Sequence, residues 1–317
     1  MQSWPPRRLR GRFAPSPSGP LHLGNLRTAL LAWLFARSSG GSFVLRLEDL
    51  DRPRMRPGAA EAILSDLRWL GLDWDEGPDV GGPCAPYRQS DRSPLYRAHL
   101  ERLLTTGLAY PCYCSRAEIA ASACAPNAPV ADSPRYPGTC RDPDRRTSRR
   151  RSRPDRAPAY RFAMTGTEQQ FTDAVVGPCR FPLAAGDDDF VIWRTDGTPA
   201  YQLAVVVDDA LMEIAQVVRG DDLLDSTPYQ LALYQAFGYQ APEWAHVPLL
   251  RDSEGARLAK RHETEGLADH RARACQPEEV VGALATSCGL VPGGTTCTAQ
   301  DLLHGFTPAR LAPQPGL

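Results

Sequence analysis

A histidine at the expected start of a helix is the first residue in this sequence that could do chemistry. His22 follows a loop of proline, serine and glycine, and Arg12 precedes that loop. The N–H groups at a helix N-terminus attract phosphate, and an imidazole there can donate to a phosphate oxygen. Gly24 has no side chain, so an adenine ring or a ribose could pack against its backbone. The run favours a nucleotide site over an ordinary turn with a solvated histidine.

Three cysteines form a second candidate site. Cys112 and Cys114 are one residue apart, and Cys140 follows after a loop. Three thiolates can hold a tetrahedral Zn²⁺ with one further ligand, although buried or unpaired thiols would show the same spacing. A site closed by four protein ligands leaves no open position, so we expect a structural zinc.

An arginine-rich segment follows these cysteines. Seven arginines lie within the twelve residues from Arg145 to Arg156. Such a run could follow an RNA backbone with salt-dependent affinity, or it could be a solvated, flexible loop. We predict a flexible basic loop here and leave its contact with RNA open.

The elements that position these residues begin with a strand, a helix and a second strand. We expect a strand over 9–13, a helix over 23–35, and a strand over 43–47 that ends beside Glu48. This order predicts an α/β fold, a Rossmann-like parallel sheet with helices on both faces. Ligands of such folds bind at the carboxyl ends of the strands, where we expect Arg12, Glu48 and Arg219 to converge.

Further elements follow with the same alternation. Either Ser226 or Thr227 could cap the last of the expected helices. The expected helices cover 59–70, 94–104 and 226–238, and the expected strands cover 190–193, 213–218 and 246–250.

Length and composition set the class of protein. The chain has 317 residues, 42% of them apolar and 23% charged, which suits one large α/β domain with a subdomain. A net charge of −1 gives no global attraction to nucleic acid, but a local patch can still bind phosphate. No apolar run is long enough for a membrane span, the N-terminus lacks the apolar region of a secretory signal, and the nine cysteines do not form a disulfide-like pattern. We expect a cytoplasmic protein without a membrane partner.

Five ordered motifs resemble those of the glutamyl-tRNA synthetases. The run RFAPSPSGPLHLGN is similar to the HIGH region of that family, and RLEDLD, PAYQLAVVVDD and VVRGDDLL match later segments. RLAKR lies where the family has its KMSKS loop. The resemblance covers residues 10–265 and implies a class I synthetase core that activates glutamate with ATP.

The resemblance also implies a glutamate pocket. Arg12 resembles a residue that pairs with a carboxylate of glutamate, and Glu48 resembles the acceptor of its α-ammonium group. A dianionic amino acid calls for two cations, and arginine offers a bidentate fork. The remaining pocket residues implied by the match are Ala14, Ser16, Tyr201 and Arg219.

The resemblance implies that the HIGH-like and KMSKS-like segments bind ATP and supply the catalytic residues. His22 and Lys260 resemble the catalytic pair, and the residues expected to bind ATP with Mg²⁺ are His22, Gly24, Asn25 and Lys260. Attack of a carboxylate on the α-phosphorus needs alignment and charge stabilisation but no protein nucleophile. The departures of these segments from the family motifs include Asn25 for histidine, Arg257 for lysine and Ala259 for serine.

The cysteine pattern is similar to a zinc site of the short family members, in which a tyrosine is the fourth ligand. By this match the ligands are Cys112, Cys114, Tyr136 and Cys140. Tyrosine is an unusual zinc ligand, so Cys124 stays a rival for the fourth position.

The expected organisation leaves no room for an anticodon-reading domain. It comprises a first catalytic half over 8–109, an inserted subdomain over 110–159, a second catalytic half over 160–265 and a short helical tail over 266–317. This organisation resembles the glutamyl-queuosine tRNA(Asp) synthetases. These enzymes activate L-glutamate without tRNA and attach it to the queuosine base at the wobble position of tRNA(Asp). Two alternatives stay open: a compact synthetase that charges a tRNA 3′ end, and a non-catalytic nucleotide- or RNA-binding paralogue.

Overall fold

A parallel β-α-β unit opens the described part of the chain. The computed structural model describes residues 9–123, 136–249 and 267–311. Strand β1 (Arg10–Phe13) leads through α1 (Leu23–Ser38) to β2 (Ser42–Leu45), which pairs with β1 in parallel. A Cβ at Gly11 would meet Cβ of Ala36 at 3.0 Å, so the glycine allows α1 to lie close against β1.

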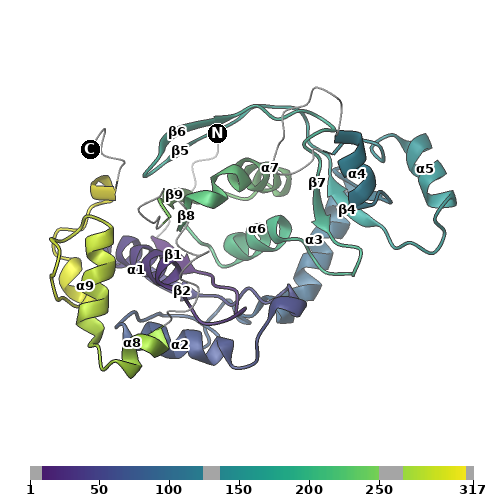
Figure 1. Ribbon diagram of the computed structural model, residues 1–317. Helices are drawn as coiled ribbons and strands as arrows, with labels where there is room; N and C mark the ends of the chain where they lie inside the picture. The colour runs from purple at the N-terminus through teal and green to yellow at the C-terminus, as the bar shows by residue number, and fades with distance from the viewer. Residues whose placement is uncertain (1–8, 124–135, 250–266, 312–317) are drawn as a thin grey trace.

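Four parallel strands form the central sheet, in the order β2-β1-β8-β9. Strand β8 is Gln216–Gly220 and β9 is Glu243–Val247. Successive residues of β8 alternate, since Val217 belongs to the core with α3, α6 and α7, and Val218 belongs to the core with α1, α2 and α9. Both faces are covered by helices (Figure 1), which confirms the predicted Rossmann-like α/β fold.

Three helices around this sheet, α2 (Ala59–Trp69), α3 (Ser93–Thr105) and α7 (Thr227–Phe237), end within two residues of the expected positions. Helix α6 (Tyr201–Leu211) was not predicted. Helices α8 (Leu267–Ala272), α9 (Pro277–Ser287) and α10 (Ala299–Leu302) lie in the region where a short helical tail is expected. Helix α8 lies beside α2, where Nη2 of Arg271 is 3.1 Å from Oδ1 of Asp66. Among the described helices, none is both long and apolar enough to cross a bilayer.

Two antiparallel sheets complete the fold. Strands β3 (Ala109–Cys112), β4 (Ala159–Phe162) and β7 (Phe190–Trp193) form one, and β5 (Gln169–Asp173) pairs with β6 (Gly177–Phe181) in a hairpin. Helices α4 (Arg116–Ala123) and α5 (Pro143–Arg151) lie at the end of the molecule opposite α9 (Figure 1). The boundaries of the inserted subdomain at 110 and 159 stay a prediction.

The arginine-rich segment is not the predicted flexible loop. It forms α5, which begins with Pro143 after Asp142. The Asp142 side chain accepts from the backbone N–H groups of Asp144 at 2.8 Å and Arg145 at 3.1 Å. A capping aspartate with proline in the first turn is a helix-start signal that the arginine content obscured.

Two predicted strands and one predicted cap were also wrong in position. Strand β8 starts later than expected because Glu213, at φ 54°, belongs to the turn that ends α6. Strand β9 starts earlier and ends before Pro248. Helix α7 follows a 3₁₀ turn over Asp221–Ser226, and the Ser226 side chain makes no capping hydrogen bond.

Candidate active site and metal cluster

The loops after β1 and β2 are joined by backbone hydrogen bonds. The N–H of Arg46 donates to the carbonyl of Phe13 at 3.0 Å, and the N–H of Glu48 donates to the carbonyl of Pro15 at 3.0 Å. Continuing the parallel register past the strand ends in this way brings the segment with Ala14 against Glu48. Ala14 is half-buried and Ser16 is exposed, so this segment lies at the surface of the site.

A buried ion network holds Glu48. Nη2 of Arg46 lies 3.0 Å from Oε1 of Glu48, and Nη1 of Arg46 lies 2.7 Å from Oδ1 of Asp209 on α6. Arg46 is fully buried. Burial raises the pKa of Glu48, against the opposing effects of Arg46 and Arg12. The network therefore holds the Glu48 carboxylate in a fixed place.

Arg12 contributes a buried guanidinium with long contacts. Its Nη1 donates to the Val218 carbonyl at 3.3 Å, and its Nε lies 3.5 Å from Oδ1 of Asp209. The Nε atom is buried and has no hydrogen-bond partner in the described part of the chain. Unsatisfied donors on a buried cation favour an anionic ligand.

Arg219, the fourth residue of β8, is a second buried guanidinium. It donates from Nη1 to Gln230 Oε1 at 2.9 Å and from Nη2 to Thr227 Oγ1 at 2.8 Å. Its Nε donates to Nε2 of His246 at 3.0 Å. Within the described residues, these side-chain partners are neutral and no carboxylate lies at ion-pair distance from Arg219. A buried cation without an ion-pair partner also favours an anionic ligand.

Tyr201, the first residue of α6, stands over these charges. The residue is 37% exposed and interacts electrostatically with Arg219, Glu48 and Arg12. The structure thus brings Arg12, Glu48 and Arg219 together at the carboxyl ends of the parallel strands, as the sequence predicted, with Tyr201 beside them. Their roles toward glutamate stay predictions.

His22 is the N-cap of α1. Its Nδ1 accepts from the backbone N–H of Asn25 at 3.3 Å, so the neutral ring carries its proton on Nε2. A Cβ at Gly24 would meet the imidazole at 3.0 Å, so a glycine there leaves room for the histidine. Lys260, Arg257 and Ala259 lie outside the described residues.

No signal in the sequence identifies the ion-pair partners beneath the pocket. Arg46 and Asp209 are charged residues inside motifs, but only the fold shows them buried and paired. His246 lies in none of the motifs, yet it contacts Arg219. Contacts between strands and helices distant in sequence cannot be found from spacing alone.

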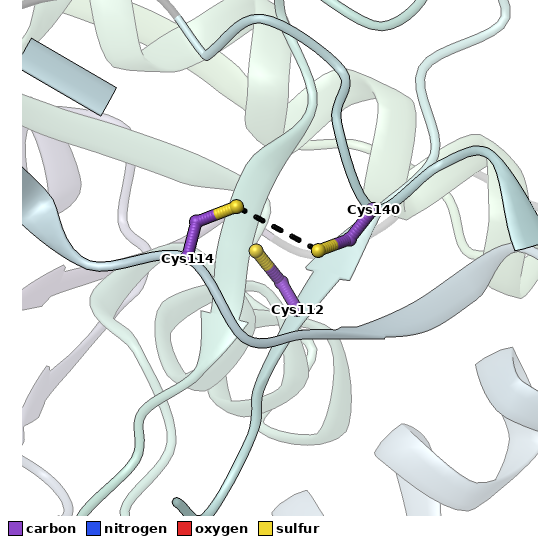
Figure 2. Close-up of side chains that lie close together, drawn as sticks. All are labelled: Cys112, Cys114 and Cys140. Carbon is purple, nitrogen blue, oxygen red and sulfur yellow. Dashed lines mark hydrogen bonds between the residues drawn. The ribbon is translucent and has the colours of Figure 1, made fainter. Parts of the chain in front are cut away.

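The three cysteines converge at the end of β3 (Figure 2). Their sulfur atoms all lie within 4.8 Å of one another, and Cys114 Sγ is 3.6 Å from Cys140 Sγ. This exceeds a disulfide bond of about 2.0 Å. It agrees with the separation of about 3.8 Å between sulfurs on a tetrahedral zinc with bonds of about 2.3 Å. The three thiol donors suggest a metal site.

Tyr136 lies beside this cluster. Its hydroxyl oxygen is 3.5 Å from Cys112 Sγ and accepts from the backbone N–H of Cys140 at 2.7 Å. The ring packs under Arg161, whose guanidinium carbon is 3.7 Å from the ring centroid. Cys124, the rival fourth ligand, lies outside the described residues.

Arginines hold the backbone around the cysteines. Arg153 Nη1 donates to the Tyr113 carbonyl at 2.8 Å, and Arg156 Nη2 donates to the Cys114 carbonyl at 3.3 Å. Glu118 on α4 forms ion pairs with Arg149 and Arg153. Part of the arginine-rich segment is therefore structural.

Comparisons with known proteins agree with this geometry. Residues 8–291 match the family "tRNA synthetases class I (E and Q), catalytic domain". A glutamyl-Q tRNA(Asp) synthetase of Symbiobacterium thermophilum is 55% identical over 307 residues, 97% of this chain and 95% of the relative. The chain belongs to the glutamyl-Q tRNA(Asp) synthetase family.

Longer class I enzymes are related to this family member over part of their length. A glutamate–tRNA ligase of the same organism is 40% identical over 96% of this chain, which covers 64% of that ligase. The crystal structure of a glutamate tRNA ligase from Elizabethkingia meningosepticum, solved with its amino acid, superposes with a TM-score of 0.80 at 31% identity. The alignment covers 96% of this chain and 66% of that one.

Proposed function

We propose that this protein activates L-glutamate with ATP, without tRNA, and transfers it to the queuosine base at the wobble position of tRNA(Asp). The observation that carries the proposal is 55% identity to a glutamyl-Q tRNA(Asp) synthetase over nearly the whole of both chains. The glutamate-tRNA ligase of the same organism is less similar, at 40% identity.

The buried charges support glutamate as the amino acid. Arg12 and Arg219 supply two cations for its two carboxylates, and Glu48 supplies one anion for its ammonium group. Because Arg46 fixes Glu48 from below, that carboxylate is in place before glutamate binds. Ala14, Ser16 and Tyr201 would complete the pocket.

Activation follows from alignment. The α-carboxylate of glutamate attacks the α-phosphorus of ATP, and pyrophosphate leaves. His22, at the N-terminus of α1, would donate to a phosphate oxygen, while Gly24 and Asn25 would lie under the adenosine. Lys260 would stabilise the leaving pyrophosphate, which Mg²⁺ accompanies. A hydroxyl of the queuosine cyclopentene ring then attacks the glutamyl carbonyl and releases AMP.

The cysteine cluster would hold one structural Zn²⁺ through Cys112, Cys114, Cys140 and Tyr136. Thiolates are soft ligands that favour zinc, and four protein ligands close the site to substrate. The Tyr136 hydroxyl already lies beside Cys112 Sγ. The zinc would fix the end of β3 relative to α5.

Exposed arginines of α5 would contact the tRNA backbone. Arg150 and Arg151 are exposed and form no ion pair among the described residues, unlike Arg149. No residue of α5 is buried, so packing gives this helix little stability. Phosphates would supply counter-charge for these arginines.

Glutamate-dependent ATP–pyrophosphate exchange, with and without tRNA, tests the activation step. Exchange without tRNA supports the proposal, because it requires a complete adenylate site in the protein alone. Exchange that occurs only with tRNA would favour a compact synthetase that charges a tRNA 3′ end. The absence of exchange both with and without tRNA would favour a non-catalytic paralogue.

Transfer is tested with two forms of tRNA(Asp) that differ only in queuosine. We expect labelled glutamate to be transferred to the queuosine-containing form alone. Charging of the form that lacks queuosine but has an intact 3′ end would overturn transfer to queuosine and leave activation standing.

A further inference from the structure

Three buried side chains, Asp173, His246 and Arg219, are joined in series by hydrogen bonds, and Arg219 is the one that faces the pocket. Strands β8 and β9 pair so that Arg219 lies opposite His246, and Arg219 Nε donates to His246 Nε2 at 3.0 Å. On the far side of the ring, His246 Nδ1 is 2.6 Å from Oδ2 of Asp173, the last residue of β5. His246 and Asp173 are at most 2% exposed.

The donor and the acceptor of both hydrogen bonds in this series are determined by the guanidinium. A guanidinium has donors only, so Nε2 of His246 must offer its lone pair to Arg219. The ring proton is then on Nδ1 and is donated to Asp173, which accepts it as a carboxylate. Reversing the ring tautomer would place two N–H groups against each other at Arg219.

Asp173 is itself fixed by the backbone. Its Oδ1 accepts from the N–H groups of Val175 and Val176, each at 2.9 Å, and from the N–H of His246 at 3.1 Å. Burial tends to raise the pKa of Asp173, but hydrogen bonds from His246, Val176 and Val175 outweigh burial and lower it. Burial lowers the pKa of His246, so the ring is neutral.

We infer that Asp173 and His246 are positioning residues that set glutamate specificity by orienting Arg219 toward the side-chain carboxylate of the amino acid. The inference rests on the proposed function, in which Arg12 and Arg219 bind the two carboxylates of glutamate, and it assigns the side-chain carboxylate to Arg219. Gln230 and Thr227 hold the two Nη atoms, and among the described residues only the Asp173–His246 pair holds the Nε edge. A guanidinium held along both edges can present its remaining N–H groups in only one orientation.

The Asp173→Asn variant tests the positioning role of Asp173, because asparagine has nearly the same size and shape as aspartate. Its Oδ1 keeps the backbone contacts, and its amide donates to His246 Nδ1, which moves the ring proton to Nε2 and opposes it to Arg219. In pyrophosphate exchange we expect the KM for glutamate to rise about tenfold or more. We expect the KM for ATP to stay unchanged and the discrimination against glutamine to fall. Asp66→Asn, which removes a buried carboxylate between α2 and α8, is the matched control and should leave all three values near wild type.

His246 provides a second, independent variant pair. His246→Ala removes the acceptor, whereas His246→Gln returns an acceptor oxygen, so we expect H246Q to recover part of the discrimination that H246A loses. Combining D173N with H246A should be no worse than H246A alone, since Asp173 acts through the imidazole.

Two results would overturn the inference while the proposed function stands: an unchanged KM for glutamate in D173N, or equal increases in the KM values for glutamate and ATP. Failure of the proposed function is recognised separately, since wild-type protein would then show no glutamate-dependent exchange. That result would overturn the inference together with the proposed function.

Discussion

Arg46 and Asp209 form an ion pair, with 2.7 Å between Nη1 and Oδ1, in which the arginine side chain is inaccessible to solvent and the aspartate side chain is 4% exposed. The same guanidinium reaches Glu48 through Nη2. The pair therefore joins α6 to the end of β2 at the floor of the pocket, and it links the stability of the fold to the placement of Glu48.

Asp209→Asn should destabilise the protein by about 3–5 kcal/mol, because it leaves the Arg46 charge buried without its nearest partner. Urea unfolding measures the loss. The control is Glu61→Gln, which removes an exposed ion pair with Arg88 and should cost less than about 1 kcal/mol. Equal losses in the two variants would contradict the burial argument.

Glutamate binding should weaken as the pH falls below neutral. Glu48 accepts an ammonium group only as a carboxylate, and burial raises its pKa above the ordinary glutamate value of about 4.3. The KM for glutamate should therefore rise at a higher pH than an exposed carboxylate would allow, while the KM for ATP stays nearly constant. Exchange assays across pH measure this. The E48Q variant should lose the pH-dependent rise, and an identical profile in E48Q would assign the titration to another group.

Removing Arg150 and Arg151 together should reduce the salt dependence of RNA binding. With alanine at both positions, the slope of log K against log salt should become shallower by about one for each arginine. Alanine keeps the helix, which circular dichroism can check. An R68A/R180A double variant removes exposed arginines from α2 and β6 as the control. A slope that falls only in this control would move the RNA surface away from α5.

Zinc content should depend on Cys140 but not on Cys297. Cys140→Ser removes one of three clustered sulfurs, so purified protein should lose zinc to a chelator and melt at a lower temperature. Cys297→Ser alters a half-buried thiol outside the cluster and should retain zinc. Tyr136→Phe decides the fourth ligand: loss of zinc supports the tyrosine, whereas retention in Y136F with loss in C124S assigns the position to Cys124.

Local signals in the sequence were sufficient for the opening of the fold. Apolar spacing placed β1, α1 and β2 to within a few residues, and the motif match brought Arg12, Glu48 and Arg219 to one edge of the sheet. Spacing could not show that Asp173 would reach His246, because the hairpin β5–β6 packs on β9 through contacts distant in sequence. It also missed α5, a helix without buried residues and therefore without apolar periodicity.

The contacts between the arginine-rich segment and the cysteine loop place positive charge beside the three sulfur atoms. A divalent zinc with three thiolates carries a net charge of −1, and a phenolate ligand would make it −2. Arg153 lies close enough to Cys114 and Cys140 to interact with their charge, and Arg156 donates to the backbone of Cys114. With zinc bound, these two arginines would act as counter-ions of the cluster, and only the outward-facing remainder of the run would be available for a polyanion. Without the metal, Arg153 keeps its ion pair with Glu118 but Arg156 loses the nearby negative charge, so metal depletion would then increase nonspecific RNA binding.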